Sequence, residues 1–143
     1  VNTRIIKGPI IVGWMGDFFY NLTKEEIDAG CIYLERMRFV DNDPVMLEYT
    51  YIPNINLPEF CKTPFVNNSL FQTLSLKHHI EINNLSQEIR AIQANYEVSR
   101  WLMTGQGKPV LHVYRKYFTT RENFKIYSSL YCNTDKYAIG SNH

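Results

Sequence analysis

The chain has 143 residues, of which 45% are hydrophobic and 20% are charged, and its formal net charge is +1. This length suits one domain, residues 1–143, with a sizeable buried core. The balanced charge disfavours a surface that binds DNA phosphates. No apolar run approaches the roughly 20 residues of a membrane span. Three cysteines without metal-binding spacing are typical of a reducing compartment, so we expect a cytoplasmic protein with no membrane contact, metal or cofactor.

The first thirty residues carry three local patterns. Residues 4–7 predict a short strand, which Gly8-Pro9 ends. Apolar residues then recur at helical spacing across residues 11–22 and predict a helix, although two glycines weaken it. Residues 23–26 have the order of a capping box, and Gly30 suits the end of the short helix that they begin.

The clearest pattern along the chain is a β-hairpin. Residues 31–39 alternate in character as a strand does, and the run Asp41-Asn42-Asp43-Pro44 is typical of a turn. Residues 45–52 form the second strand, and a proline follows it. We therefore expect two antiparallel strands joined by a tight turn.

Short helices and strands alternate through the rest of the chain. Because hairpins dominate, antiparallel pairing is favoured over the helix crossovers of a parallel sheet. The predicted fold class is therefore α+β, with a mainly antiparallel sheet and short helices. The predicted elements are a loop over 54–67, a helix from Asn68 or Ser69 to Leu76, a strand over 80–94, a short helix over 95–103, and a hairpin of residues 110–119 and 124–131.

Two arginines in the first hairpin are the strongest candidates for chemistry. Arg36 and Arg38 lie two positions apart on one predicted strand, so both point to the same face. Ile32 and Leu34 share that face, which is therefore at least partly buried, and a buried guanidinium needs an anionic partner. The partner is either an acid of the protein itself or the phosphate or carboxylate of a ligand, which the guanidinium fork fits well.

Glu48 on the next strand is the obvious protein partner, and the turn decides whether it reaches the arginines. A three-residue loop puts Glu48 on the same face as Arg36 and Arg38, whereas a two-residue loop puts it on the opposite face. On the same face, Glu48 either pairs with Arg38 or accepts hydrogen bonds from ligand hydroxyls. No spacing of histidines, glycines or acids elsewhere predicts a metal site, a phosphate loop or a catalytic triad.

Several segments resemble one protein family, and they do so in the same order along the chain. The hairpin from Leu34 to Pro53 resembles the signature hairpin of the UTRA domain, the effector-binding half of HutC-like, GntR-type transcription regulators. Further likeness lies in residues 68–71, 88–91, 107–111, Arg115 and 135–137. The resemblance implies a chorismate-lyase-like fold that forms a homodimer and binds a small anionic effector, a phosphorylated sugar or a carboxylate. It also implies that DNA is contacted only by an N-terminal winged helix-turn-helix, which we expect to be absent from this chain.

Residue by residue, the resemblance implies roles in effector binding. Arg36 and Arg38 match an arginine pair that holds the anionic group of the effector. Ser69 matches a hydroxyl that helps to hold the same group, and Glu48 matches an acid that meets the polar body of the ligand. The roles of the two arginines agree with the geometry expected for residues on one strand face.

Two positions depart from the family pattern. Phe71 stands where the family often has tyrosine, and Ile126 stands where sugar-phosphate binders tend to have a second glutamate. The implied effector is therefore less polyhydroxylated than an amino-sugar phosphate, or it is a sugar bound in a different orientation. The predicted ligand-binding residues are Arg36, Arg38, Glu48, Ser69, Phe71, Tyr127 and Ser128.

Three functions compete on this basis. The leading one is an effector-sensing domain of a DNA-binding regulator. The related lyase fold makes a chorismate-lyase-like enzyme the second, although no residue stands out as its acid or base. The third is a purely structural dimerisation module, which an Arg36–Glu35 or Arg38–Glu48 ion pair filling the cleft would support.

Overall fold

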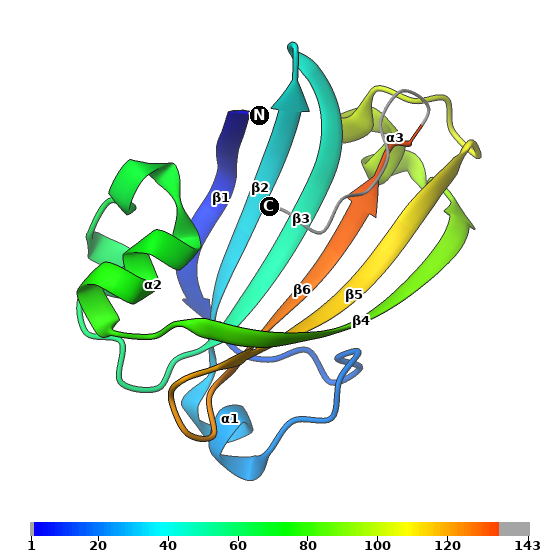
Figure 1. The fold of residues 1–143 in the computed structure, drawn as a ribbon. Helices are drawn as coiled ribbons and strands as arrows, with labels where there is room; N and C mark the ends of the chain where they lie inside the picture. Colours follow the sequence, from blue (N-terminus) through cyan, green and yellow to red (C-terminus); the bar gives the residue numbers. More distant parts are fainter. Residues whose placement is uncertain (1, 135–143) are drawn as a thin grey trace.

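The fold is built on one curved antiparallel sheet (Figure 1). The computed structural model describes residues 2–134, and within them six strands lie in the order β1-β2-β3-β6-β5-β4. All five neighbouring pairs are antiparallel, so the predicted α+β class with a mainly antiparallel sheet is confirmed. The strands are β1 Asn2–Val12, β2 Cys31–Val40, β3 Asp43–Pro53, β4 Ile82–Gln93, β5 Pro109–Thr119 and β6 Lys125–Cys132.

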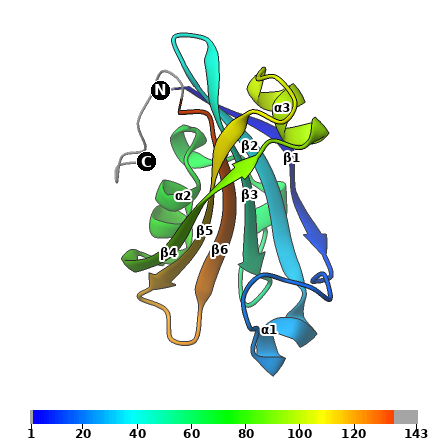
Figure 2. The same ribbon diagram turned by 90° about the vertical axis from the view of Figure 1, so that its right-hand side faces the viewer.

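Short helices cover both faces of the sheet. Figure 2 shows α2 on one side of the sheet and α1 and α3 on the other. We call these sides the α2 face and the α3 face. Because side chains alternate along a strand, Leu34 and Arg36 of β2 belong to the α2 face, and Tyr33 and Glu35 belong to the α3 face. The helices are α1 Lys24–Ala29, α2 Leu70–His78 and α3 Tyr96–Leu102, with 3-10 turns at Phe60–Lys62 and Val66–Asn68.

Each helix-covered face has its own apolar cluster. Helices of this length are unstable alone in water, so α2 and α3 depend on packing against the sheet. The cluster on the α2 face includes Ile32, Leu34, Ile52, Leu70, Leu74 and Ile126, and the cluster on the α3 face includes Met37, Leu47, Ala94, Val98, Leu102 and Val110.

The N-terminal segment differs from the prediction. Strand β1 does not end at Gly8-Pro9 but continues to Val12, and residues 13–22 form no helix, so both of these predictions were wrong. Proline is tolerated there because β1 is an edge strand whose pairing with β2 is irregular at this point. The apolar residues at helical spacing pack their rings on the sheet instead. Phe18, for example, lies edge-on to Tyr51 with the ring centroids 5.0 Å apart.

The predicted helix starts are confirmed. Thr23 and Glu26 form both halves of the capping box of α1, with bonds of 2.9 and 3.1 Å, and Gly30 follows the helix. Ser69 caps α2, and Asn95 caps α3. The caps of α1 and α2 depend on residues within one helical turn, which is why the sequence pattern alone predicts them.

Candidate functional site

A β-bulge in the first hairpin decides which face Glu48 occupies. The turn between β2 and β3 has two residues, with positive φ angles of 49° and 66°. A regular two-residue loop would have put Glu48 on the face opposite the arginines. Instead, the register shifts next to Arg38, which leaves Val45 as an extra residue on β3. Because of this extra residue, Glu48 points to the same face as the two arginines, and it lies directly opposite Arg36.

Arg36, Arg38 and Glu48 form a buried charge cluster on the α2 face. The Nη2 atoms of Arg36 and Arg38 lie 2.6 and 3.2 Å from the same atom, Oε1 of Glu48. The two arginine side chains are 6% and 14% exposed, and the glutamate side chain is 2% exposed. The Oγ of Ser128 lies 3.5 Å from the other carboxylate oxygen, Oε2. One carboxylate therefore serves two guanidiniums and a hydroxyl that come from two other strands.

Arg115 brings a third guanidinium to this region. It lies opposite Ser128 in the register of β5 and β6, and it is 1% exposed. Its Nε donates to Oε1 of Gln87 over 3.0 Å, and its Nη1 donates to the hydroxyl of Tyr117 over 3.4 Å. Sequence reasoning did not select Arg115 as a site residue. The signal was nonetheless present, because Arg115 alternates with Val113 and Tyr117 on an inward-facing row, as Arg36 does with Leu34.

The electrostatics of the cluster favour a further anion. Burial by itself raises the pKa of Glu48, but the charges of Arg36 and Arg38, the hydrogen bond from Arg36 and the charge of Arg115 outweigh it and lower that pKa. Glu48 is therefore ionised, and Arg36 and Arg38 share its single charge. The buried Nε atoms of both arginines find no hydrogen-bond partner among the described residues. A small anion at these donors would supply the missing hydrogen bonds and the missing charge.

Two more predicted residues lie at the start of α2. Ser69 is the N-cap, and its Oγ accepts a hydrogen bond from the N–H of Gln72 over 3.2 Å. Within residues 2–134, no hydrogen bond joins Ser69 to Arg36 or Arg38. The ring of Phe71 packs edge-on against Tyr117 at 5.1 Å, and the Tyr117 hydroxyl in turn meets Arg115. Phe71 therefore borders the arginine region through Tyr117.

The structure does not bring Tyr127 to the arginines. Tyr127 and Ser128 are neighbours on β6, so they point to opposite faces, and Tyr127 lies on the α3 face. Its hydroxyl donates to Oε2 of the buried Glu26 over 2.6 Å. Ile126 does share the α2 face but is fully buried in the apolar cluster there, so it offers no polar contact to a ligand. Residues 135–137, which carried part of the family resemblance, lie outside the described residues.

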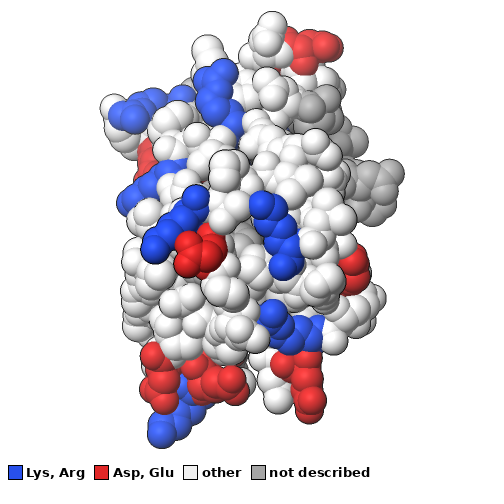
Figure 3. Space-filling view, turned by 90° about the vertical axis from the view of Figure 1, so that its left-hand side faces the viewer, with Lys and Arg blue, Asp and Glu red and all other residues white. Residues whose placement is uncertain are grey.

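The described part of the chain also bears on other kinds of site. No three His, Cys, Asp or Glu side chains within residues 2–134 come together in a way suited to a metal ion. None of the helices in this range is long and apolar enough to span a bilayer. On the side shown in Figure 3, Lys and Arg side chains are scattered, and Asp and Glu gather mainly at the lower end. That side therefore presents no continuous basic surface of the kind that holds nucleic acid.

Solved structures of bacterial regulators share this fold. A GntR-family transcriptional regulator from Enterococcus faecalis matches with a TM-score of 0.80 and 19% identity, over 99% of this chain and 100% of that chain. A protein of Escherichia coli assigned as a regulator matches with a TM-score of 0.77 and 26% identity, over 97% of this chain and 100% of that chain. The ligand-binding domain of a Bordetella bronchiseptica protein assigned to the GntR family matches with a TM-score of 0.75 and 14% identity, over 99% of this chain and 90% of that chain.

Sequence comparison gives the family directly. No curated protein sequence matches the chain. The family model of the UTRA domain matches residues 25–138, which include the first hairpin, the arginine cluster and all strands from β2 to β6. UTRA domains are regulatory rather than enzymatic, so this match also decides against the lyase alternative. The chain therefore belongs to the UTRA family, the ligand-binding domains of HutC-like, GntR-type transcription regulators.

Proposed function

We propose that this UTRA domain senses a small anionic metabolite, which binds at Arg36 and Arg38 and changes the DNA binding of the regulator. One observation carries the proposal: two buried guanidiniums share one carboxylate oxygen, and both Nε donors lack a partner among the described residues. A buried charge without full compensation is costly, and a bound anion removes that cost. The ligand-binding domain from Bordetella bronchiseptica has the same fold, which supports a ligand site in this domain.

The surroundings narrow the chemical class of the effector. Guanidinium donors fit phosphate and carboxylate equally well. The hydroxyls of Thr50 and Ser128 lie 3.2 Å apart beside Glu48, so one polar side of a ligand has partners there. Ile126 and Phe71 supply only apolar surface nearby. We therefore propose a carboxylate or phosphate ester with few hydroxyls, or a sugar phosphate turned so that its hydroxyls face Glu48.

In this proposal the domain works as a cytoplasmic homodimer joined to an N-terminal winged helix-turn-helix. Strand β4 supports an interface, because it is an edge strand and nearly all of its residues are exposed. Leu85 and Ile89 on this strand are 36% and 47% exposed, and apolar residues on an open edge are typical of a contact surface. Effector binding would change the spacing of the two DNA-binding heads and thereby the affinity for the operator.

One observation favours a second candidate, a purely structural dimerisation domain. Arg38 does pair with Glu48, which is one of the two ion pairs expected if the protein fills its own cleft. The other expected pair is not formed, because Arg36 pairs with Glu48 while Glu35 points to the opposite face. In that case the site needs no ligand, and added anions leave the stability of the domain unchanged.

Native mass spectrometry of the purified domain, before and after mild denaturation, is the first measurement. A small acid released from a folded dimer supports the sensor and gives the effector class. If the dimer releases no ligand, the next measurement is its melting temperature in the presence of inorganic phosphate, citrate or a hexose phosphate. A ligand present at one hundred times its dissociation constant stabilises the folded state by about 2.7 kcal/mol.

Arg38→Ala provides the decisive variant, since Glu48 keeps Arg36 as a partner and the fold is preserved. The matched control is Arg100→Ala, which removes an exposed arginine in the last turn of α3, away from both the cluster and β4. We expect anion stabilisation to disappear in Arg38→Ala, to persist in Arg100→Ala, and the dimer to remain in both. Persistence in both variants contradicts the anion site. Loss of the dimer in Arg38→Ala and Arg36→Ala alike would instead make the arginines interface residues.

A further inference from the structure

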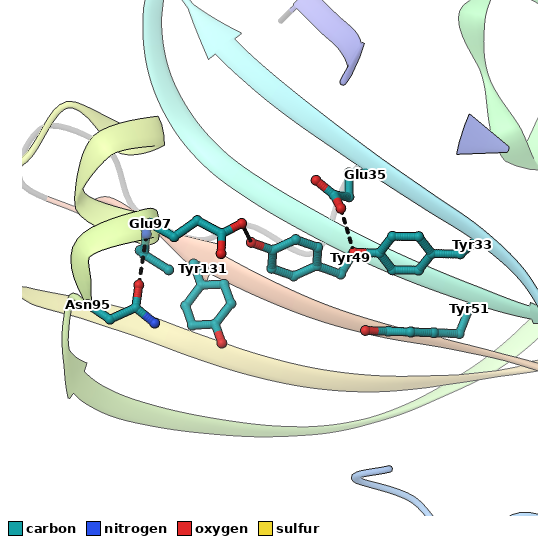
Figure 4. A pocket seen from close by; sticks show the side chains of 8 residues that line it. Tyr33, Glu35, Tyr49, Tyr51, Asn95, Glu97 and Tyr131 are labelled. Atoms are coloured by element: carbon teal, nitrogen blue, oxygen red, sulfur yellow. Dashed lines mark hydrogen bonds between the residues drawn. The ribbon is translucent and has the colours of Figure 1, made fainter. Parts of the chain in front are cut away.

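A cavity of about 370 Å³ opens on the α3 face, on the side of the sheet away from the arginine cluster. Side chains of β2, β3 and β6 line one part of it, and the start of α3 lines another part (Figure 4). This volume lies at the lower end of the range for pockets that bind small molecules. The lining residues are Tyr33, Glu35, Tyr49, Tyr51, Asn95, Glu97, Val98 and Tyr131.

Four tyrosine rings make this cavity strongly aromatic. The rings of Tyr33 and Tyr49 are nearly parallel, with an interplanar angle of 9° and centroids 6.4 Å apart. Tyr51 is tilted by 48° against Tyr33 at 5.1 Å. Tyr131 stands at 82° to Tyr49 at 6.0 Å, so its ring forms a wall rather than an extension of the same plane. The faces of aromatic rings carry negative potential, and rings set at different angles surround a bound cation well.

Two carboxylates add negative charge to the same cavity. Glu35 accepts a hydrogen bond of 2.7 Å from the hydroxyl of Tyr33, and Glu97 in the first turn of α3 accepts one of 3.0 Å from Tyr49. The lining includes neither Lys nor Arg among the described residues. Two hydroxyl donors that an anion would use are thus already bonded to carboxylates. The cavity therefore selects against the phosphates and carboxylates that the arginine cluster favours.

One cation of the protein lies close to the cavity. The Nζ of Lys7 lies over the ring of Tyr33, 5.8 Å from its centroid, and Lys7 pairs with Glu35 in the register of β1 and β2. An ammonium group thus already occupies one aromatic face at this end of the cavity. The other end, between Tyr49 and Glu97, has no such neighbour among the described cation contacts.

We propose that this cavity binds a small organic cation, with its alkylated ammonium group against the rings of Tyr49 and Tyr51 and beside Glu97. Aromatic faces and carboxylates together are the chemistry that recognises alkylated ammonium groups. The site is separate from the anion site because neighbouring residues on the same strands, such as Arg36 and Glu35, point to opposite faces. The domain then has two ligand sites of opposite charge preference.

Choline tests the charge preference, with dimethylbutanol as its uncharged isostere. Both are titrated into the intact chain, and binding is followed by isothermal titration calorimetry and by the NMR signals of the tyrosine side chains. We expect choline to bind in the millimolar range and to shift the signals of the cavity tyrosines, while the isostere binds about threefold to fivefold more weakly. Equal binding of the two probes, or no shift of the cavity tyrosines, overturns the proposal.

Variants then locate the site. Glu97→Gln and Glu35→Gln are each expected to weaken choline binding about twofold to fivefold, because each removes one solvent-accessible charge contact. Lys7→Gln is expected to strengthen choline binding slightly, because it removes a positive charge near the cavity. The matched control is Glu88→Gln, which removes the same charge from the α3 face on β4, outside the cavity. Equal affinities in Glu97→Gln and Glu88→Gln contradict the proposal. Choline binding that is lost in Arg38→Ala also contradicts it, because it would place the cation on the other face.

Discussion

The two faces of the sheet carry opposite chemistry on the same strands. On the α2 face, the buried side chains of Arg36 and Glu48 form an ion pair, with Nη2 of the arginine 2.6 Å from Oε1 of the glutamate. On the α3 face, their sequence neighbours Glu35 and Tyr49 line an accessible cavity whose described lining contains carboxylates and no cation. Because side chains alternate along a strand, residues that are adjacent in sequence are separated by the sheet itself. One thin sheet can therefore hold a basic site and an acidic site without the two neutralising each other.

The faces also differ in how much their charges matter for stability. The ion pairs on the α2 face are nearly inaccessible to water, so removing one partner leaves a buried charge. Glu97 on the α3 face is exposed, and water and salt screen its charge. The same substitution is therefore expected to have unequal effects on the two faces.

The largest effect is expected for Glu48→Gln. It leaves Arg36 and Arg38 buried without a counter-charge, so the free energy of unfolding should fall by about 3 kcal/mol or more. Its counterpart on the other face, Glu97→Gln, should cost less than about 1 kcal/mol. Urea unfolding of both variants at neutral pH measures the difference. Similar losses in the two variants would remove the contrast between a buried and a screened face, whereas partial rescue of Glu48→Gln by phosphate would strengthen it.

A smaller effect distinguishes two neighbouring residues of β6. Tyr127→Phe removes the donor to buried Glu26 and should cost about 1–3 kcal/mol, with no change in the response to phosphate. Ser128→Ala removes a hydroxyl beside Glu48 and should cost about 1 kcal/mol while weakening phosphate binding severalfold. Urea unfolding and phosphate-dependent melting temperatures test both variants. A phosphate response lost only in Tyr127→Phe would move the anion site to the α3 face.

The smallest effect is a pH dependence that belongs to the α3 face. His112 lies with its Nε2 2.7 Å from the Oγ of Ser129 and stacks on Tyr131 at 4.1 Å. Burial, and secondly the charge of Arg90, lower the pKa of His112 below its ordinary value. Between that lowered pKa and about 6.5, the unfolded chain binds a proton that the folded chain does not, so stability falls as the pH falls through this window.

In His112→Gln, the free energy of unfolding should therefore fall less than in the unmodified protein as the pH decreases from about 7 through this window. Urea unfolding at a series of pH values measures it. The pKa of Glu48 is lowered, so its contribution is present above its unfolded pKa of about 4.3 and is lost only at lower pH, which keeps the two effects apart. An unchanged slope in His112→Gln would show that another group titrates in this window.

Local patterns in the sequence determined much of the fold. Alternation and turn residues predicted both hairpins, and the capping residues predicted the starts of α1 and α2. The shared face of Arg36 and Arg38 also followed from their spacing alone. The ordered resemblance to UTRA domains pointed to the family before any contact was known. All of these depend on residues a few positions apart or on short motifs, where backbone geometry leaves little choice.

The assembly of the site was decided by the tertiary structure. Glu48 reaches Arg36 only because Val45 is an extra residue in β3, and Arg115 joins them from a distant part of the chain. The apolar residues at helical spacing near the N-terminus became a strand end and a set of rings on the sheet, since those contacts outweighed a weak helix. Within a strand, geometry alone sets which side chains share a face. Between strands, the register sets it, and a one-residue bulge reverses every face assignment across the pair.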